Sequence, residues 1–260
     1  MPKNSDRGNS DGGKGGDSRR QARERARLEA AKQQRQRRIR QAIVVAVVGL
    51  VAIGIVVSAV LLGRADRADR VPTASTNVTV GGTSVPFSID GSAVQVGKQD
   101  AKVTLDLWVD YSCPHCQEFE AASNDVITQK VAAGTLKVRY HNIQVVTAYG
   151  TQAGSAGACV ANSASDQWWA FNAALYANHS AETDDWKGPQ LADFAQQQGI
   201  SSSAALTCIR DQRYTTWITD NGSAATAAGV TGTPTLFFNG EKSDTISGAA
   251  LGAKIDELAK

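Results

Sequence analysis

The 260-residue sequence predicts an α/β domain with an inserted block of helices, preceded by a single N-terminal membrane-spanning helix. Three observations predict this architecture. An uncharged apolar run covers residues 42–63, a buried strand is expected at 103–109, and a Cys-x-x-Cys pair follows that strand on the first turn of a helix. After this helix we expect a strand, several helices, a hairpin and a closing helix.

Residues 1–41 form a basic tail with 13 Lys+Arg against 5 Asp+Glu. The tail has almost nothing apolar to bury, so we expect it to be disordered, above all at its Gly-rich start. Residues 21–40 are rich in helix-forming side chains and are compatible with a charged helix near a membrane. Such a tail also suits nucleic-acid binding, but the apolar run that follows favours a position beside a membrane.

Residues 42–63 contain no charged side chain. At about 1.5 Å per residue, a helix of that length spans the roughly 30 Å hydrocarbon layer of a bilayer. The many Lys and Arg residues before the apolar run predict that the N-terminus is cytoplasmic and that the chain after the run is extracytoplasmic, in a bacterial cell membrane. The alternative is a cleaved signal peptide. The long basic region, the long apolar run and the lack of a small-x-small site favour an uncleaved signal-anchor.

Residues 64–83 are polar and contain Gly, Ser and Thr, which predicts a linker between the membrane and an outer domain at 84–260. The chain beyond the linker carries 11 basic and 18 acidic groups, a net charge of −7. An acidic globular domain is not expected to bind nucleic acid.

Within the outer domain, Val103–Val109 is the expected central strand and residues 135–145 its neighbour. Two short strands are expected before them, at 86–89 and 94–96, around a turn at Asp90-Gly91. The inserted helical block covers about 148–228. Its expected helices are 151–163, 167–177, 189–198 and 203–221, the last with a cap at Ser203. After the block we expect a strand at 235–238, a turn at Asn239-Gly240, a strand at 244–246 and a helix at 252–260.

The cysteine pair is the stretch with the clearest chemistry. Cys113 stands at a helix start, where unpaired backbone N–H groups and the helix dipole favour a thiolate, the form that attacks disulfides. Pro114 suits the first helical position because it lacks an N–H group. A half zinc site is one alternative, but the other cysteines are solitary, and we assign no metal. A purely structural Cys113–Cys116 disulfide is another, although so short a loop gives little stabilisation.

Residues 110–120, which contain Cys-Pro-His-Cys, resemble the active-site segment of DsbA-like proteins, the extracytoplasmic branch of the thioredoxin superfamily. Residues 229–240 are similar to the family's cis-proline loop with the strand and turn that follow it. The two segments come in the family's order and together cover about residues 100–260. The resemblance implies a thioredoxin-like fold with an inserted helical subdomain. We assign no cofactor.

The resemblance also implies roles for the pair. Cys113 would be the attacking thiol and Cys116 the resolving thiol, while Pro114 and His115 tune the potential. A histidine that donates a hydrogen bond to Cys113, or stands as a cation beside it, would stabilise the thiolate and make the disulfide more oxidising. The alternative is an ordinary solvated loop histidine.

Thr233 and Pro234 correspond to the cis-proline loop that faces Cys113 in the family, where the backbone pairs with an extended substrate. The alternative is a trans proline in a plain turn. DsbA has Val at the position of Thr233, and Thr is closer to the isomerase-like relatives.

The family also places a buried acid six residues before the first cysteine, and here that residue is Leu107. Asp106 is one position away, so it points to the other face of the strand and receives no catalytic role. We expect Asp110 to cap the active-site helix.

Cys159 and Cys208 each lie on a predicted helix of the insertion. Two leftover cysteines in an oxidising compartment most often pair, and some relatives carry such a pair, so we expect a structural disulfide. Two buried free thiols are the alternative. We expect one helix of the insertion to face the core with a stripe of aromatic side chains, Trp168, Trp169 and Phe171.

The sequence therefore predicts a DsbA-like dithiol oxidase that introduces disulfides into exported proteins. Its expected partners are reduced or unfolded exported proteins, a membrane redox protein that reoxidises it, and the membrane itself through 42–63. The alternatives are an isomerase or reductase of the same fold, and a non-catalytic peptide-binding or chaperone domain. The intact cysteine pair argues against the last of these.

Overall fold

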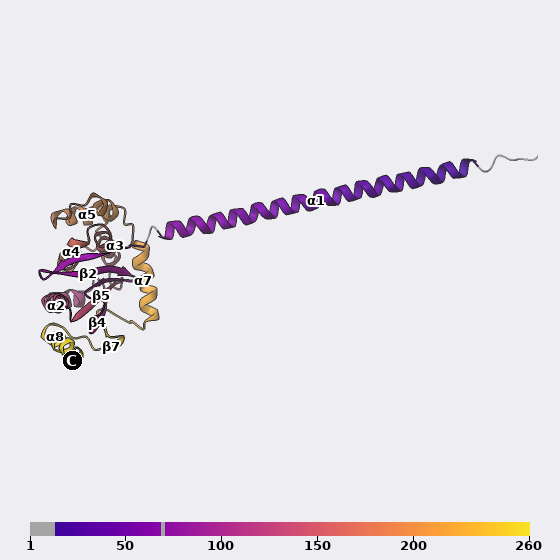
Figure 1. Cartoon of the computed structure of the whole chain (residues 1–260). Helices are drawn as coiled ribbons and strands as arrows, with labels where there is room; N and C mark the ends of the chain where they lie inside the picture. Colours follow the sequence, from indigo (N-terminus) through magenta and orange to yellow (C-terminus); the bar gives the residue numbers. More distant parts are fainter. Residues whose placement is uncertain (1–13, 69–70) are drawn as a thin grey trace, which may run out of the picture. The chain divides into compact units, whose positions relative to one another are not determined.

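The structure is a computed structural model that describes residues 14–68 and 71–260 (Figure 1). The chain divides into two units, residues 1–65 and 66–260. The Gly-rich start, which we expected to be disordered, lies outside the described residues over positions 1–13.

The first unit is built on one helix, α1 (Lys14–Ala68), which is 55 residues long. It covers residues 21–40, where the sequence allowed a charged helix, because Arg, Gln, Ala and Glu are strong helix formers, and it begins within the Gly-rich start that we expected to be disordered. Arg27–Ser58 of α1 is long and apolar enough to cross a membrane, by length and composition. This stretch contains most of the residues predicted to span the membrane.

The second unit contains a seven-stranded sheet in the order β1-β2-β3-β5-β4-β6-β7. β4 and β5 pair in parallel and the other neighbours pair antiparallel. The strands are β1 (Ser75–Val80), β2 (Thr83–Asp90), β3 (Ala93–Val96), β4 (Val103–Val109), β5 (Leu136–Asn142), β6 (Thr235–Phe238) and β7 (Glu241–Ser243).

Two strands differ from the prediction. β1 lies inside the segment 64–83 that we expected to be a linker, where Val78 and Val80 are buried and the other side chains of the strand are exposed. β7 begins at Glu241 and not at residue 244. Asn239 and Gly240 have φ of 51° and 88°, so they form the expected two-residue turn and the partner strand starts directly after it.

Seven helices belong to this unit. The helix expected at 203–221 is two helices, because the chain turns at Gln212, whose φ is 49°. Ser202, and not Ser203, caps the first of them by accepting the backbone N–H of Ala205 at 3.2 Å. The helices are α2 (Pro114–Ala132), α3 (Ala148–Ser163), α4 (Ser165–Asn178), α5 (Gly188–Gln197), α6 (Ser203–Arg210), α7 (Thr215–Ala227) and α8 (Gly248–Leu258).

The main core lies on one face of the sheet, where the side chains of Leu105 and Leu107 are buried with Tyr140 of β5. Helix α2 covers this face and packs against α4 and α8 (Figure 1). Trp168 of α4 is buried against Tyr140, with ring centroids 5.5 Å apart, as the predicted core stripe requires. Trp169 is only partly buried.

A smaller cluster lies on the opposite face of the sheet, where Trp108 packs with Ala225 of α7. Asp106 is on this face, as its place in the strand predicted. Its carboxylate lies 2.8 Å from His141 Nε2 and 2.8 Å from the guanidinium of Arg139. Asp106 is therefore part of a largely buried polar network outside the cysteine site.

Cys159 of α3 and Cys208 of α6 form a disulfide, as expected, with an S–S distance of 1.99 Å and a Cα–Cα distance of 5.6 Å. Both cysteines are buried. The bond links two helices of the inserted block whose residues are 49 positions apart in the sequence.

Candidate active site

The cysteine pair lies where β4 leads into α2. Cys113 is the N-cap of α2, with an extended backbone (φ −88°, ψ 120°), and Pro114 is at the start of the helix. The backbone N–H groups of Cys116 and Gln117 both donate to the Cys113 carbonyl at 3.0 Å. The attacking thiol predicted from the sequence is thus placed at the positive end of the helix dipole, as expected.

Both cysteines are free thiols in the structure. Both side chains are buried, but Cys113 is 5% exposed and Cys116 only 1%, so the first is the more accessible of the two. Burial raises the pKa of the Cys116 thiol well above its ordinary value. Cys116 is therefore a neutral thiol that must lose a proton before it can attack.

The second predicted segment faces the pair. The Thr233–Pro234 peptide bond is cis, as expected from the resemblance. The Cys113 thiol donates to the Thr233 carbonyl at 3.3 Å, which brings the two segments together. Thr245 donates to the Pro234 carbonyl at 3.2 Å and so supports the loop from the side of the β7–α8 connection. The hydroxyl of Thr233 is buried, and it is among the groups that stabilise the thiolate form of Cys116.

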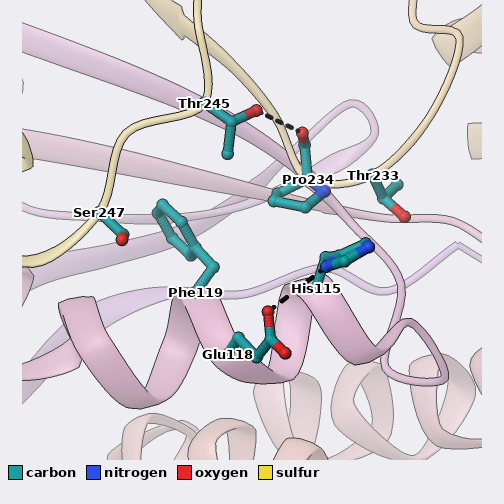
Figure 2. A pocket seen from close by; sticks show the side chains of 7 residues that line it. All are labelled: His115, Glu118, Phe119, Thr233, Pro234, Thr245 and Ser247. Carbon is teal, nitrogen blue, oxygen red and sulfur yellow. Dashed lines mark hydrogen bonds and ion pairs between the residues drawn. The ribbon is translucent and has the colours of Figure 1, made fainter.

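His115 does not make the contact that we expected. Its side chain is 78% exposed, and its Nδ1 lies 3.3 Å from Glu118 Oε2, one turn along α2 (Figure 2). The described residues include no hydrogen bond between His115 and Cys113. The second helical position leaves the imidazole exposed, with its hydrogen-bond partner on the same helix.

A hollow lies between the start of α2 and the cis-proline loop (Figure 2). Its volume is about 330 Å³. The hollow is open to solvent, and its lining includes Thr233, whose carbonyl accepts the hydrogen bond of the Cys113 thiol. The residues that line it are His115, Glu118, Phe119, Thr233, Pro234, Thr245 and Ser247.

The expected role of Asp110 as the cap of α2 is wrong, because Cys113 occupies that position. The buried carboxylate of Asp110 instead holds two loops together. Its Oδ1 accepts the backbone N–H and the hydroxyl of Ser112, at 2.8 and 2.7 Å. Its Oδ2 accepts the backbone N–H groups of Val145 and Val146, at 2.7 and 2.9 Å. Asp110 is thus a positioning residue for the cysteine loop.

Gly150 of α3 makes room for this arrangement. A Cβ atom at Gly150 would lie 2.2 Å from Asp110 Oδ1 and 3.1 Å from the Ser112 hydroxyl. Any side chain there would displace the carboxylate. Nothing in the sequence marks this glycine, because its partner lies 40 positions away and the loop geometry decides the contact.

Glu120 is a second residue that sequence reasoning missed. It is 5% exposed, on the face of α2 that carries Cys116. Asn124 donates to Glu120 Oε1 at 3.0 Å and Asn172 of α4 approaches the same oxygen at 3.5 Å. Burial raises the pKa of Glu120 to about 7, and the Asn124 hydrogen bond only partly opposes it.

Leu107, at the family's acid position, is fully buried in the main core and carries no proton-transfer group. The described residues contain no cluster of three or more His, Cys, Asp or Glu side chains able to hold a metal ion. The zinc alternative for the cysteine pair therefore has no second set of ligands in this part of the chain.

A thioredoxin-like sheet, two thiols at a helix start and a facing cis-proline together define a thiol–disulfide exchange protein. The family model described as Thioredoxin matches residues 90–257. The chain therefore belongs to the thioredoxin family, as a DsbA-like thiol–disulfide oxidoreductase.

Solved structures of the same fold come from several bacteria. The chain is 26% identical to DsbA from Mycobacterium tuberculosis in its reduced form, with a TM-score of 0.56, over 65% of this chain and 92% of that one. It is 21% identical to MdbA, a thiol–disulfide oxidoreductase from Corynebacterium diphtheriae, with a TM-score of 0.59, over 69% and 95% of the two chains. At 21% identity, the similarity to MdbA concerns the fold alone.

Two curated relatives match at the sequence level. A Rickettsia bellii protein with the provisional name protein-disulfide oxidoreductase is 24% identical over 66% of this chain and 67% of its own length. A protein from Salinispora tropica named Na(+)/H(+) antiporter NhaA 3 is 26% identical over 61% of this chain. The chain spans 23% of the antiporter's length, so the match concerns a part of that protein.

Proposed function

We propose that the chain is an extracytoplasmic thiol–disulfide oxidoreductase that works through the Cys113–Cys116 pair, most simply as a dithiol oxidase of exported proteins. The observation that carries the proposal is the Cys113 thiol at the N-terminus of α2, 3.3 Å from the Thr233 carbonyl of the cis-proline loop. Helix N-termini favour a thiolate, and a stabilised thiolate makes the corresponding disulfide a better oxidant.

The reaction begins with the oxidised pair. A substrate thiolate attacks Cys113 Sγ, the Cys113–Cys116 bond breaks, and Cys116 leaves as a thiolate that takes up a proton. A second substrate thiolate attacks the substrate sulfur of the mixed disulfide, a substrate disulfide forms, and Cys113 leaves as a thiolate. The substrate loses two electrons and the pair gains them. The hollow beside Pro234 would hold the extended substrate backbone near Cys113.

Disulfide isomerisation or reduction is the second candidate. It is favoured by Thr233 in the cis-proline loop and by the position of His115, whose described partner is Glu118 and not Cys113. Without a histidine contact the thiolate is less stabilised, which favours a less oxidising pair. Both candidates use the same two cysteines and differ in the direction of electron flow.

The proposed location is the outer side of a bacterial cell membrane, with the N-terminus in the cytoplasm and residues 42–63 crossing the bilayer. The apolar span at Arg27–Ser58 and the basic residues before it support this orientation. The proposed partners are reduced or unfolded exported proteins, together with a membrane redox protein that reoxidises the pair.

The equilibrium potential of the Cys113–Cys116 pair against glutathione tests the proposal. We expect a value well above that of thioredoxin, which is about −270 mV. A value close to thioredoxin's would reject the oxidase and favour the reductase. A reporter fused after Lys260 should be active only outside the cytoplasm, and a mature N-terminus near Ala65 would show that the apolar run is cleaved.

A further inference from the structure

Glu118 is the one acidic side chain among the described residues that line the hollow beside the cis-proline loop. Its side chain is 76% exposed, and its Oε2 lies 3.3 Å from His115 Nδ1. No described residue donates a hydrogen bond to its Oε1. A carboxylate has acceptor sites on both oxygens, so Glu118 can still bind a cation that enters the hollow.

The charges around this hollow are not balanced. None of the described lining residues is a Lys or an Arg. Asp244, an exposed residue, directly precedes the lining residue Thr245, and the Nζ of nearby Lys242 lies 3.1 Å from the Gly229 carbonyl. The outer domain as a whole has a net charge of −7. The hollow should therefore attract a positively charged segment and repel a negatively charged one.

The apolar side chains of the hollow suit the stem of a long basic residue. Phe119 is 3% exposed, and its ring lies between α2 and the segment that carries Ser247 (Figure 2). Pro234 adds a second apolar surface to the lining. Lys and Arg pack their methylene stems against apolar groups while the charged end stays in water. A Lys or Arg could thus lay its stem beside Phe119 and place its charge at Glu118.

The hollow lies within reach of residues that flank a cysteine bound to Cys113. Thr233, whose carbonyl is 3.3 Å from the Cys113 sulfur, also lines the hollow. Glu118 follows Cys113 by five residues, which corresponds to about 7.5 Å of rise along α2. An extended chain advances about 3.3 Å per residue. Side chains two or three positions from the bound cysteine therefore come level with Glu118.

We propose that Glu118 is a specificity-determining residue, which favours exported proteins that carry a Lys or Arg two or three residues from the reacting cysteine. The inference rests on the proposed function and adds a chemical class of substrate to it. Bond exchange stays with Cys113 and Cys116, and Glu118 acts on the approach and seating of the substrate. Because Glu118 is exposed, each charge effect is worth about threefold in rate, so basic and acidic flanks should differ by about tenfold.

The test uses the oxidised full-length chain in detergent, with three reduced single-cysteine peptides. The peptides carry Lys, Ser or Glu at the second and third positions on both sides of the cysteine. Acid quenching, alkylation and mass spectrometry measure how fast each peptide opens the Cys113–Cys116 disulfide. Each rate is divided by the peptide's rate with the uncharged 2-hydroxyethyl disulfide, because a nearby Lys also makes a thiol more acidic. The wild type should prefer the Lys peptide to the Glu peptide by about tenfold at low salt.

Three variants assign this preference to one carboxylate. Glu118→Gln should lower the ratio of the Lys-peptide rate to the Glu-peptide rate below about threefold, and Glu118→Lys should make the Glu peptide the faster one. Asp125→Asn removes the same charge from an exposed position further along α2, outside the lining of the hollow, and should keep the wild-type ratio.

A ratio that stays above about threefold in Glu118→Gln overturns the proposal, as does a wild-type ratio below about threefold. A fall in the ratio of Asp125→Asn equal to that of Glu118→Gln also overturns it, because the preference would then come from the net charge of the domain. A wild type that reacts with the Ser peptide but shows no preference counts against Glu118 alone. If no peptide opens the wild-type disulfide, the proposed function fails together with this inference.

Discussion

Replacing Glu120 with glutamine should change how the stability of the outer domain depends on pH. The carboxyl group is buried, and its pKa is raised from an ordinary value of 4.5 to about 7. Below pH 4.5 the folded and unfolded chains both hold the proton. Between pH 4.5 and 7 the unfolded chain releases it while the folded chain retains it, so the wild type loses stability as pH rises.

The size of this loss follows from the two pKa values. A difference between 4.5 and about 7 corresponds to roughly 3 kcal/mol, fully lost above pH 7. Glutamine does not titrate, and its Oε1 can still accept the two asparagine hydrogen bonds. Relative to the wild type, Glu120→Gln should therefore gain about 3 kcal/mol between pH 4 and pH 8.

Urea unfolding at pH 4, 6 and 8, with both proteins oxidised, measures the difference. Tryptophan fluorescence reports on the outer domain, because all 5 tryptophans lie beyond residue 100. Asp125→Asn, on the exposed face of the same helix, should show no such trend. If the stability difference between Glu120→Gln and the wild type is the same at all three pH values within about 0.5 kcal/mol, the buried-acid reasoning is refuted.

Three further predictions concern the cysteines and Asp110. Cys116→Ser should accumulate mixed disulfides with thiol-containing peptides, visible by mass spectrometry, and Cys113→Ser should form none. Replacing Cys159 and Cys208 together by alanine should lower stability in urea by about 4 kcal/mol, on the chain-entropy model; a loss under about 1 kcal/mol would contradict it. Asp110→Ala leaves two buried donors of Ser112 and two part-buried backbone donors without their acceptor and should cost at least about 3 kcal/mol, whereas an unchanged unfolding midpoint would rule out the positioning role.

The parts of the site that the sequence predicted are those determined by local chemistry. The Cys-Pro-His-Cys segment after a buried strand predicted a helix start at the first cysteine, and Pro114 is at that start. The Asn239-Gly240 pair predicted a tight turn, because these two residues accept positive φ readily. The cis peptide before Pro234 followed from the family resemblance and not from the residues alone.

The residues that the sequence did not reveal depend on contacts between distant segments. Asp110 lies four positions before Pro114, the first residue of α2, and only the loop at 145–146 shows that its carboxylate binds there and does not cap the helix. Glu120 falls among exposed polar positions of α2 in the sequence, and its burial results from α4 packing over that face. The sequence did not reveal strand β1, because its exposed residues are polar and their composition resembles that of a linker.

Two separate openings lie beside the active-site helix α2. The hollow beside Pro234 is formed by α2, the cis-proline loop and the segment before α8. The cavity that reaches Glu120 is formed by α2 and α4. A protein bound in the first would leave the second open, because the two share no lining residue.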